Sequence, residues 1–245
     1  MIALASAETT DTILGGCLKL IQPKRGYRFS VDSILLGRFA QCRSGERVLE
    51  LGAGCGVISL MIASLGKPSA VAAIEVQPLL ASMIKRNAVL NQLNNVTAIE
   101  ADLRIPETAR LDAASFDLIV ANPPYRRINS GRQSPNLGRR LARDESGASL
   151  GDFVSAAARY ARHGGRFATI FAAPRSAELM TELRAGRLEP KRIRMVHPRL
   201  DQPASTILVE ARKNAGVGAE IEPPLIMYSA KGVYSDEARA MLALE

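Results

Sequence analysis

The sequence predicts an α/β domain built on a doubly wound, mostly parallel sheet. Three observations predict it: short apolar runs alternate with helical patterns, a glycine-rich turn follows one of these runs, and polar residues stand where several runs end. Strands that alternate with helices favour a parallel sheet that helices cover on both faces. Ligands of such sheets bind beyond the carboxyl ends of the strands, so the polar residues there form the candidate site.

The expected elements follow one another from residue 33 to residue 210. Strands are predicted at residues 48–51, 70–74, 96–100, 116–121, 166–171, 192–197 and 205–210. Helices are predicted at residues 33–39, 57–64, 78–91 and 152–162. Glu50, Glu75, Asp102 and Asn122 fall at or just after the ends of the first four strands. Parallel strands end at the same edge of a sheet, so we expect these four side chains to lie near one another.

Composition and charge restrict the class of protein. A chain of 245 residues suffices for one α/β core, because domains commonly hold roughly 100–200 residues and α/β domains run longer. Hydrophobic residues make up 47% and charged residues 23%, which is normal for a globular chain and indicates neither disorder nor a fibre. The net charge of +8 and the pI near 9.7 favour a polyanionic partner such as nucleic acid, because Lys and Arg displace counterions from phosphates.

The sequence gives no sign of export, membrane insertion or metal binding. The first twelve residues hold two acids and no base, unlike a signal peptide, and no apolar stretch approaches the ~20 residues that cross a bilayer. Cys17, Cys42 and Cys55 are odd in number, and His163 and His197 are the only histidines. We therefore expect a cytoplasmic protein with neither a disulfide framework nor a metal site.

A glycine-rich turn joins the first strand to the following helix. Gly52, Gly54 and Gly56 let the backbone turn tightly and approach a ligand where a Cβ atom would collide. A dinucleotide fingerprint has its third glycine after a two-residue gap, and Val57 occupies that position here. The spacing disfavours a nicotinamide cofactor, and the turn is interpreted as the loop for another nucleotide-type ligand.

Acidic residues follow the second and third strands. Glu75 lies about 20 residues past the loop, where a carboxylate can accept hydrogen bonds from both hydroxyls of a ribose. Asp102 ends the third run and can receive the N6 amine of an adenine. Each acid on its own is equally compatible with a solvated strand end. Their order along the chain favours a nucleotide site.

Asn122-Pro123-Pro124-Tyr125 follows the fourth strand and indicates a site for an NH2 group. A delocalised amine is a poor nucleophile, and two acceptors aimed at its N–H bonds would favour tetrahedral geometry. The Asn122 side-chain oxygen supplies one acceptor, and the carbonyl of Pro123, restricted by the two rings, supplies the other. Tyr125 offers a face for stacking. The alternative is a plain turn that ends a buried strand.

With these motifs the chain resembles the class I S-adenosylmethionine-dependent methyltransferases over nearly its whole length. Residues 50–56 match the cofactor loop, Glu75 the ribose acid and residues 122–125 the catalytic motif. Within that superfamily it most resembles the bacterial tRNA(Val) adenine-N6 methyltransferases. Three stretches carry this closer resemblance: residues 26–36, residues 131–136 with 142–145, and residues 222–228.

The resemblance implies a Rossmann-like, seven-stranded sheet with one antiparallel strand, in a single domain of residues 1–245. Residues 1–44 would be a leader that closes the cofactor pocket, and residues 45–245 the catalytic core. S-adenosylmethionine is the implied cofactor, with Glu50 orienting the loop or the cofactor's amino group. The leader residues Phe29 and Asp32 are also assigned to cofactor binding, as are Val76 and Leu103. Asp32 is equally suited to cap the helix at residues 33–39.

Arginines crowd the stretch after the catalytic tetrapeptide and suggest an RNA-binding loop. They are Arg126, Arg127, Arg132, Arg139, Arg140 and Arg143. The planar guanidinium pairs with phosphate through two hydrogen bonds and stacks on unpaired bases. The alternative is a solvated basic loop with Asp144 and Glu145 as counter-charges.

We expect methyl transfer to the N6 amine of an adenine in tRNA, beside the anticodon of tRNA(Val). Asn-Pro-Pro-Tyr also occurs in protein-glutamine and guanine-N2 methyltransferases, so both activities stay open. An RNA-binding protein without turnover is the alternative from another class. The oligomeric state is left open.

Overall fold

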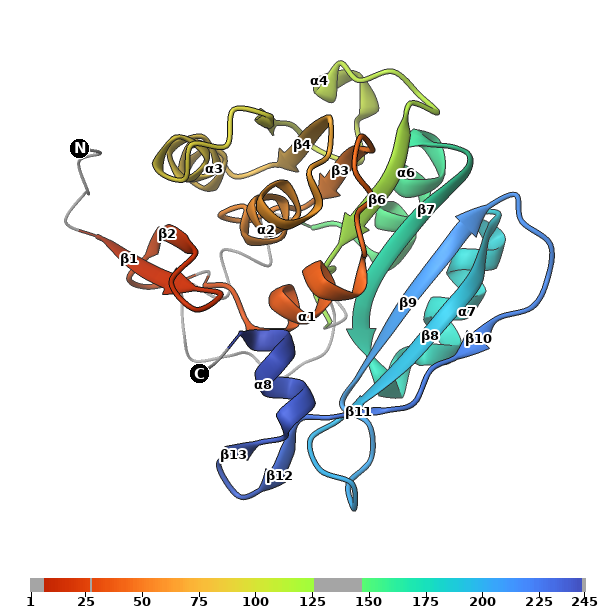
Figure 1. Ribbon diagram of the computed structural model, residues 1–245. Helices are drawn as coiled ribbons and strands as arrows, with labels where there is room; N and C mark the ends of the chain where they lie inside the picture. Colours follow the sequence, from red (N-terminus) through yellow and green to blue (C-terminus); the bar gives the residue numbers. More distant parts are fainter. Residues whose placement is uncertain (1–6, 27, 126–146, 244–245) are drawn as a thin grey trace.

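A nine-stranded mixed sheet forms the centre of the molecule, with helices on both of its faces (Figure 1). The computed structural model describes residues 7–26, 28–125 and 147–243. The strands of this sheet are β3 (Arg47–Leu51), β4 (Ala70–Glu75), β5 (Val96–Glu100), β6 (Phe116–Ala121), β7 (Ala161–Ala172), β8 (Leu188–His197), β9 (Thr206–Lys213), β10 (Glu220–Ile221) and β11 (Leu225–Ile226). Their order is β10-β8-β9-β7-β6-β3-β4-β5, and β11 also pairs with β8.

Seven strands, β3 to β9, make the core of this sheet. β3 pairs in parallel with β4 and β6, β4 with β5, and β6 with β7. β9 lies between β7 and β8 and is antiparallel to both. The predicted fold class, a mostly parallel seven-stranded sheet with one antiparallel strand, is therefore confirmed. β10 and β11, of two residues each, extend the β8 edge and were not predicted.

Helices alternate with the strands along the chain. They are α1 (Val31–Phe39), α2 (Val57–Gly66), α3 (Pro78–Leu90), α4 (Pro106–Ala109), α6 (Leu150–Tyr160), α7 (Ser176–Ala185), α8 (Asp236–Leu242) and the 3-10 turn η1 (Ala173–Arg175). The helix expected at residues 152–162 starts and ends two residues earlier. Ser149 and Asp152 form a capping box that fixes its start, and β7 already begins at Ala161. None of the described helices is long and apolar enough to cross a membrane.

Two apolar layers hold the helices to the sheet. Neighbouring residues of a strand point to opposite faces, so Leu118 and Val120 of β6 join one layer, and Ile119 and Ala121 join the other. The first layer packs under α1, α2 and α3. The second packs under α6 and α7. Because both faces are covered, β6 is an apolar run with little alternation, which is why the sequence identifies it clearly.

The N-terminal segment is a hairpin of β1 (Glu8–Ile13) and β2 (Leu18–Pro23) that α3 holds in place. Asn87 is fully buried: its Oδ1 accepts from Ile21 N at 2.7 Å, and its Nδ2 donates to Ile21 O at 2.9 Å. One turn later, Asn91 makes the same pair of bonds with Lys19, at 2.9 and 2.7 Å. Asn87 also donates to Cys55 O at 3.0 Å, which ties the hairpin to the glycine loop.

The C-terminal segment packs beside the N-terminal one. α8 contacts α1 and follows a small hairpin of β12 (Tyr228–Ala230) and β13 (Val233–Tyr234). The Ser235 hydroxyl caps α8 by accepting from Ala238 N at 3.1 Å. Figure 1 shows this hairpin at the end of the sheet where the arrows of β6 and β7 point.

Candidate active site

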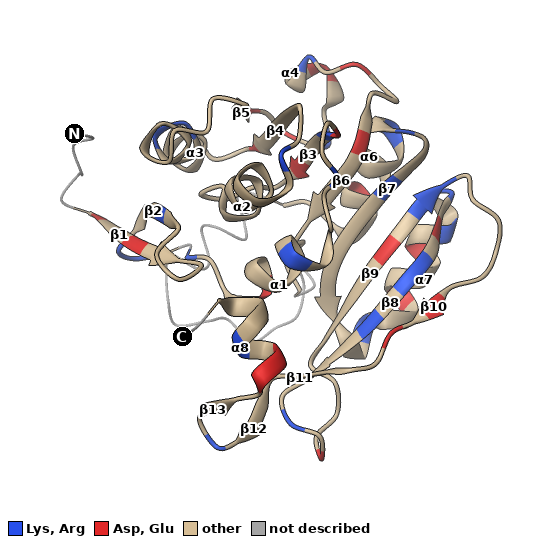
Figure 2. Ribbon diagram, viewed as in Figure 1, with Lys and Arg blue, Asp and Glu red and all other residues tan. Residues whose placement is uncertain are grey.

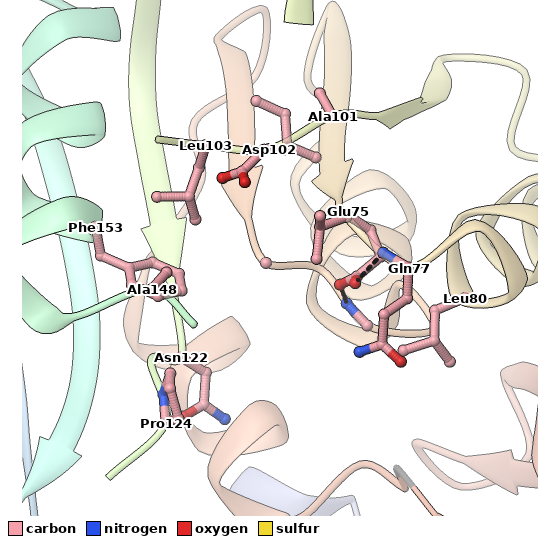
Figure 3. Close-up of a pocket in the computed structure, with 14 residues that line it drawn as sticks. Glu75, Gln77, Leu80, Ala101, Asp102, Leu103, Asn122, Pro124, Ala148 and Phe153 are labelled. Carbon is pink, nitrogen blue, oxygen red and sulfur yellow. Dashed lines mark hydrogen bonds between the residues drawn. The ribbon is translucent and has the colours of Figure 1, made fainter. Parts of the chain in front are cut away.

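A cavity opens at the carboxyl ends of β3 to β6, where ligands of doubly wound sheets bind (Figure 3). Residues that follow these four strands form most of its wall, and the start of α6 closes one side. The lining residues are Gly52, Gly54, Ile74, Glu75, Val76, Gln77, Leu80, Ala101, Asp102, Leu103, Asn122, Pro124, Ala148 and Phe153. Eight of them were predicted as site residues from the sequence.

The glycine loop needs its glycines for conformation and for space. Gly52, Gly54 and Gly56 have φ values of 66°, 57° and 88°, in the left-handed region. A Cβ atom on Gly52 would lie 3.1 Å from Cε1 of Phe153, whose ring lies directly beside the loop. Gly56 is the N-cap of α2, and a Cβ there would meet Ile84, so Gly56 shapes the loop without lining the cavity.

Glu75 fixes the loop against the end of β4. Its Oε2 accepts from Gly54 N at 2.8 Å and its Oε1 from Gln77 N at 2.9 Å. The side chain is buried in the protein, and burial raises the pKa of Glu75. Each carboxylate oxygen has further acceptor capacity toward the cavity, where Figure 3 shows the group.

Glu50 lies behind the loop rather than in the cavity. It is 2% exposed, and its Oε2 accepts from Ser59 N at 2.8 Å and from Ser59 Oγ at 2.5 Å. These bonds join the end of β3 to the first turn of α2. Burial raises the pKa of Glu50 to about 8, although both bonds from Ser59 act in the opposite direction.

Asp102 extends into the cavity and is held by its neighbour Arg104. Arg104 Nε lies 2.9 Å from Oδ1 and Nη2 lies 2.6 Å from Oδ2, a two-pronged ion pair. The bond from the Arg104 side chain holds the pKa of Asp102 below its usual range. The group is therefore an ionised acceptor near neutral pH.

The tetrapeptide after β6 is positioned by the N-terminal helix. Asn122 Nδ2 donates to Ser33 Oγ of α1 at 3.4 Å, and no described residue donates to its Oδ1. Asn122 and Pro124 line the cavity opposite Glu75 and Asp102, as Figure 3 shows. Pro123 is buried and lies outside the lining.

Tyr125 is held from three directions and also lies outside the cavity lining. Its hydroxyl donates to Asp32 Oδ2 at 2.8 Å, and its carbonyl accepts from Arg175 Nη1 at 2.6 Å. Its ring packs edge-on against Phe171, with centroids 5.8 Å apart. Burial raises the pKa values of both Asp32 and Tyr125.

Two leader residues differ in position from what the sequence suggested. Asp32 was assigned to cofactor binding, and the alternative that it caps the first helix is wrong: Ser30 is the N-cap, and Asp32 lies inside the first turn, where it accepts a hydrogen bond from Tyr125. Phe29 packs against the apolar layer under α1 and lines a different surface hollow, next to β1. Neither residue lines the cavity at the glycine loop.

Sequence reasoning missed several lining residues. Gln77 and Leu80 follow Glu75 at the start of α3, where Pro78 marks the first helical turn. Phe153 enters from α6, whose start could have been found from the Ser149 and Asp152 spacing. The arginines at 126, 127, 132, 139, 140 and 143 lie outside the described residues. Within the described ranges, no group of three or more His, Cys, Asp or Glu side chains is placed to hold a metal ion.

Comparisons with known proteins agree with the resemblance inferred from the motifs. Residues 37–129 match the family model of the TRM5/TYW2 methyltransferase domain. The chain is 26% identical over 219 residues to a protein of a Flavobacteriaceae bacterium (strain 3519-10) that is named tRNA1(Val) (adenine(37)-N6)-methyltransferase. The alignment covers 88% of this chain and 90% of the relative.

Solved structures share the fold. A predicted O-methyltransferase from Agrobacterium tumefaciens aligns with a TM-score of 0.70 and 23% identity, over 86% of this chain and 94% of its own. TYW2 of M. jannaschii, solved in complex with AdoMet, aligns with a TM-score of 0.58 and 19% identity, over 86% and 88%. At these identities the structural likeness establishes the fold of this chain.

Proposed function

We propose that this chain, a methyltransferase by its class I fold and its family match, transfers a methyl group from S-adenosylmethionine to the N6 amine of an adenine in tRNA. One observation carries the proposal: Asn122 lies at the carboxyl end of β6 and faces Glu75 and Asp102 across one cavity. An amine-holding amide thus lies opposite two acids suited to a nucleoside. An adenine of a tRNA is the substrate for which the Flavobacteriaceae relative is named.

The residues present fit the proposed cofactor. The left-handed glycines leave room for close backbone approach, and Glu75 has acceptor capacity for two ribose hydroxyls. Asp102, kept ionised by Arg104, accepts from an adenine amine. When bound, the cofactor supplies a methyl group activated by a sulfonium charge. The AdoMet complex of the M. jannaschii neighbour supports this choice.

The chain's own residues would then hold the target amine. Asn122 Oδ1 accepts one N–H bond and Pro123 O accepts the other, which brings the nitrogen toward tetrahedral geometry. Ser33 keeps the Asn122 amide in the orientation that presents its oxygen. A base inside a stack is out of reach, so the adenine must be swung out, with the Tyr125 ring as its stacking surface. The proposed reaction needs no metal and no covalent nucleophile.

The leader is part of the proposed active site. We propose that residues 1–44 close the cofactor pocket of a single catalytic domain, because α1 contacts both ends of the tetrapeptide: Ser33 meets Asn122, and Asp32 meets Tyr125. The proposed RNA substrate also places the enzyme in the cytoplasm. For the arginine-rich stretch at residues 126–143, phosphate binding remains a proposal from the sequence.

The test is transfer of tritium from labelled S-adenosylmethionine into deproteinised RNA and, separately, into protein, both from a strain that lacks this gene. Nucleoside analysis should find the label in N6-methyladenosine of the tRNA fraction. Label in N2-methylguanosine would instead identify guanine as the substrate, and label in protein glutamine would identify a protein substrate. Tight RNA binding with no label in either fraction would indicate a binding protein without turnover.

A further inference from the structure

A second groove lies at the same edge of the sheet as the candidate active site. Its lining comes from the β8–β9 loop, through Pro198, Arg199 and Gln202, and from the β12–β13 hairpin, chiefly through Tyr228 and Lys231. Neither the glycine loop nor the tetrapeptide contributes to this groove. No part of the proposed methyl transfer uses these residues.

The topology sets the distance between the two sites. β6, β7 and β8 run in the same direction, so the loops after them emerge at one edge. Asn122 directly follows β6, and Arg199 lies two residues after β8. The order β8-β9-β7-β6 separates the two strands by three spacings, roughly 14 Å at ~4.8 Å each. A nucleic acid bound at Asn122 can therefore extend over the groove.

Backbone bonds fix the hairpin to the end of β8. Met227 N donates to His197 O at 2.8 Å, and Tyr228 N donates to Pro198 O at 2.9 Å. The rings of Tyr228 and Tyr234 stack with centroids 4.8 Å apart and planes 20° apart. Tyr228, the ring of this pair that lines the groove, is therefore held in place as its aromatic wall.

The groove presents cations that the protein leaves largely uncompensated. Arg199 Nε lies 3.6 Å from Asp201 Oδ1, and both side chains are exposed, at 42% and 76%, so this pair is weak. Lys231 is exposed at the hairpin turn, and no described residue forms an ion pair or hydrogen bond with its amine. Figure 2 shows basic segments in the β12–β13 turn and in the loop beside it.

We propose that this groove binds the phosphate backbone of the RNA substrate next to the nucleotide that enters the active site. Two exposed cations beside the half-buried ring of Tyr228 suit a polyanion with stackable bases, and the net charge of +8 has the matching sign. An acidic protein surface would gain less from an aromatic wall. The proposal rests on the proposed function, because it takes the substrate to be RNA.

The test compares two double variants of the full chain. R199E/K231E reverses both charges of the groove. K67E/R110E makes the same change in net charge at the opposite edge, because Lys67 and Arg110 are exposed and precede the parallel strands β4 and β6. Binding of total tRNA is measured against salt for each variant, together with binding of S-adenosylhomocysteine and the kinetics of methyl transfer.

R199E/K231E should bind tRNA about tenfold more weakly or worse near 0.1 M salt, with a log–log salt slope reduced by about 2, one unit per lost phosphate contact. Its KM for RNA should rise while kcat and S-adenosylhomocysteine affinity stay unchanged, and K67E/R110E should match the wild type. Equal RNA affinity in the two variants would overturn the proposal that the groove binds RNA, and it would leave the proposed function intact. If the wild type transfers no methyl group to RNA, the proposed function fails. The difference in RNA affinity between the two variants still decides whether the groove binds RNA.

Discussion

Removing the buried side chain of Asn87 should destabilise the fold far more than removing that of Asn91, one helical turn later. In Asn87→Ala, the amide N–H of Ile21 and the carbonyls of Ile21 and Cys55 lose their partners. Asn87 is 0% exposed, so water cannot replace these bonds without entering the packing. An unsatisfied buried polar group costs about 1–3 kcal/mol, and three such groups set an expected loss of about 3–9 kcal/mol.

Asn91→Ala is the matched control, since it removes the same side chain one helical turn away. Its partner Lys19 lies at the surface, where water can take over the lost bonds, so we expect a loss below about 1 kcal/mol. Equilibrium unfolding in urea gives both values, and the slope of the transition tests whether each variant unfolds in one step. Equal losses in the two variants would refute the argument, because it depends on the burial of Asn87.

Three further predictions concern the site. Asn122→Ala should lower kcat by about 10²-fold or more, because it removes an acceptor that only the target amine uses. The affinity for S-adenosylhomocysteine should not change. Near-normal turnover would show that Asn122 does not hold the amine. Glu75→Ala should weaken S-adenosylhomocysteine binding by about 10- to 100-fold, equivalent to about 1.5–3 kcal/mol for a charged hydrogen-bond partner, as measured by calorimetry. Glu50 has a folded pKa of about 8, above its unfolded value of about 4.5, so the folded state binds the extra proton. Its contribution to stability is full below about pH 4.5 and is lost as pH rises to about 8. Urea unfolding at pH 5 and 8.5 should therefore show a larger pH-dependent loss in the wild type than in Glu50→Gln; an equal loss would place the titrating group elsewhere.

The strands were predictable because local sequence determines them. β6 is buried on both faces, so its residues form an apolar run that the sequence displays directly. α6 starts two residues before the predicted residue 152, and the capping box of Ser149 and Asp152 is a local signal for that start. β10 and β11 have no such signal, because two-residue strands exist only by pairing with β8.

Some features of the candidate site could likewise be predicted from the sequence, and others could not. Glu75, Asp102 and Asn122 could be assigned to one cavity, because each follows a strand and parallel strands end together. The contact between Asp32 and Tyr125 could not be inferred, since 93 residues separate them and no periodicity relates them. Arg104 illustrates a third case: its pairing with Asp102 is local, yet the sequence permits many rotamers and only the structure selects one.

The two short strands beside β8 cover part of a sheet edge that could otherwise pair with other molecules. β8 would otherwise present a ten-residue row of unpaired backbone groups at the margin of the sheet. β10 and β11 occupy parts of that row, and Pro223 and Pro224 between them have no N–H groups with which to recruit another strand. An exposed edge of that length is a template for edge-to-edge aggregation. The segment after β9 therefore reduces edge-to-edge aggregation between copies of this chain.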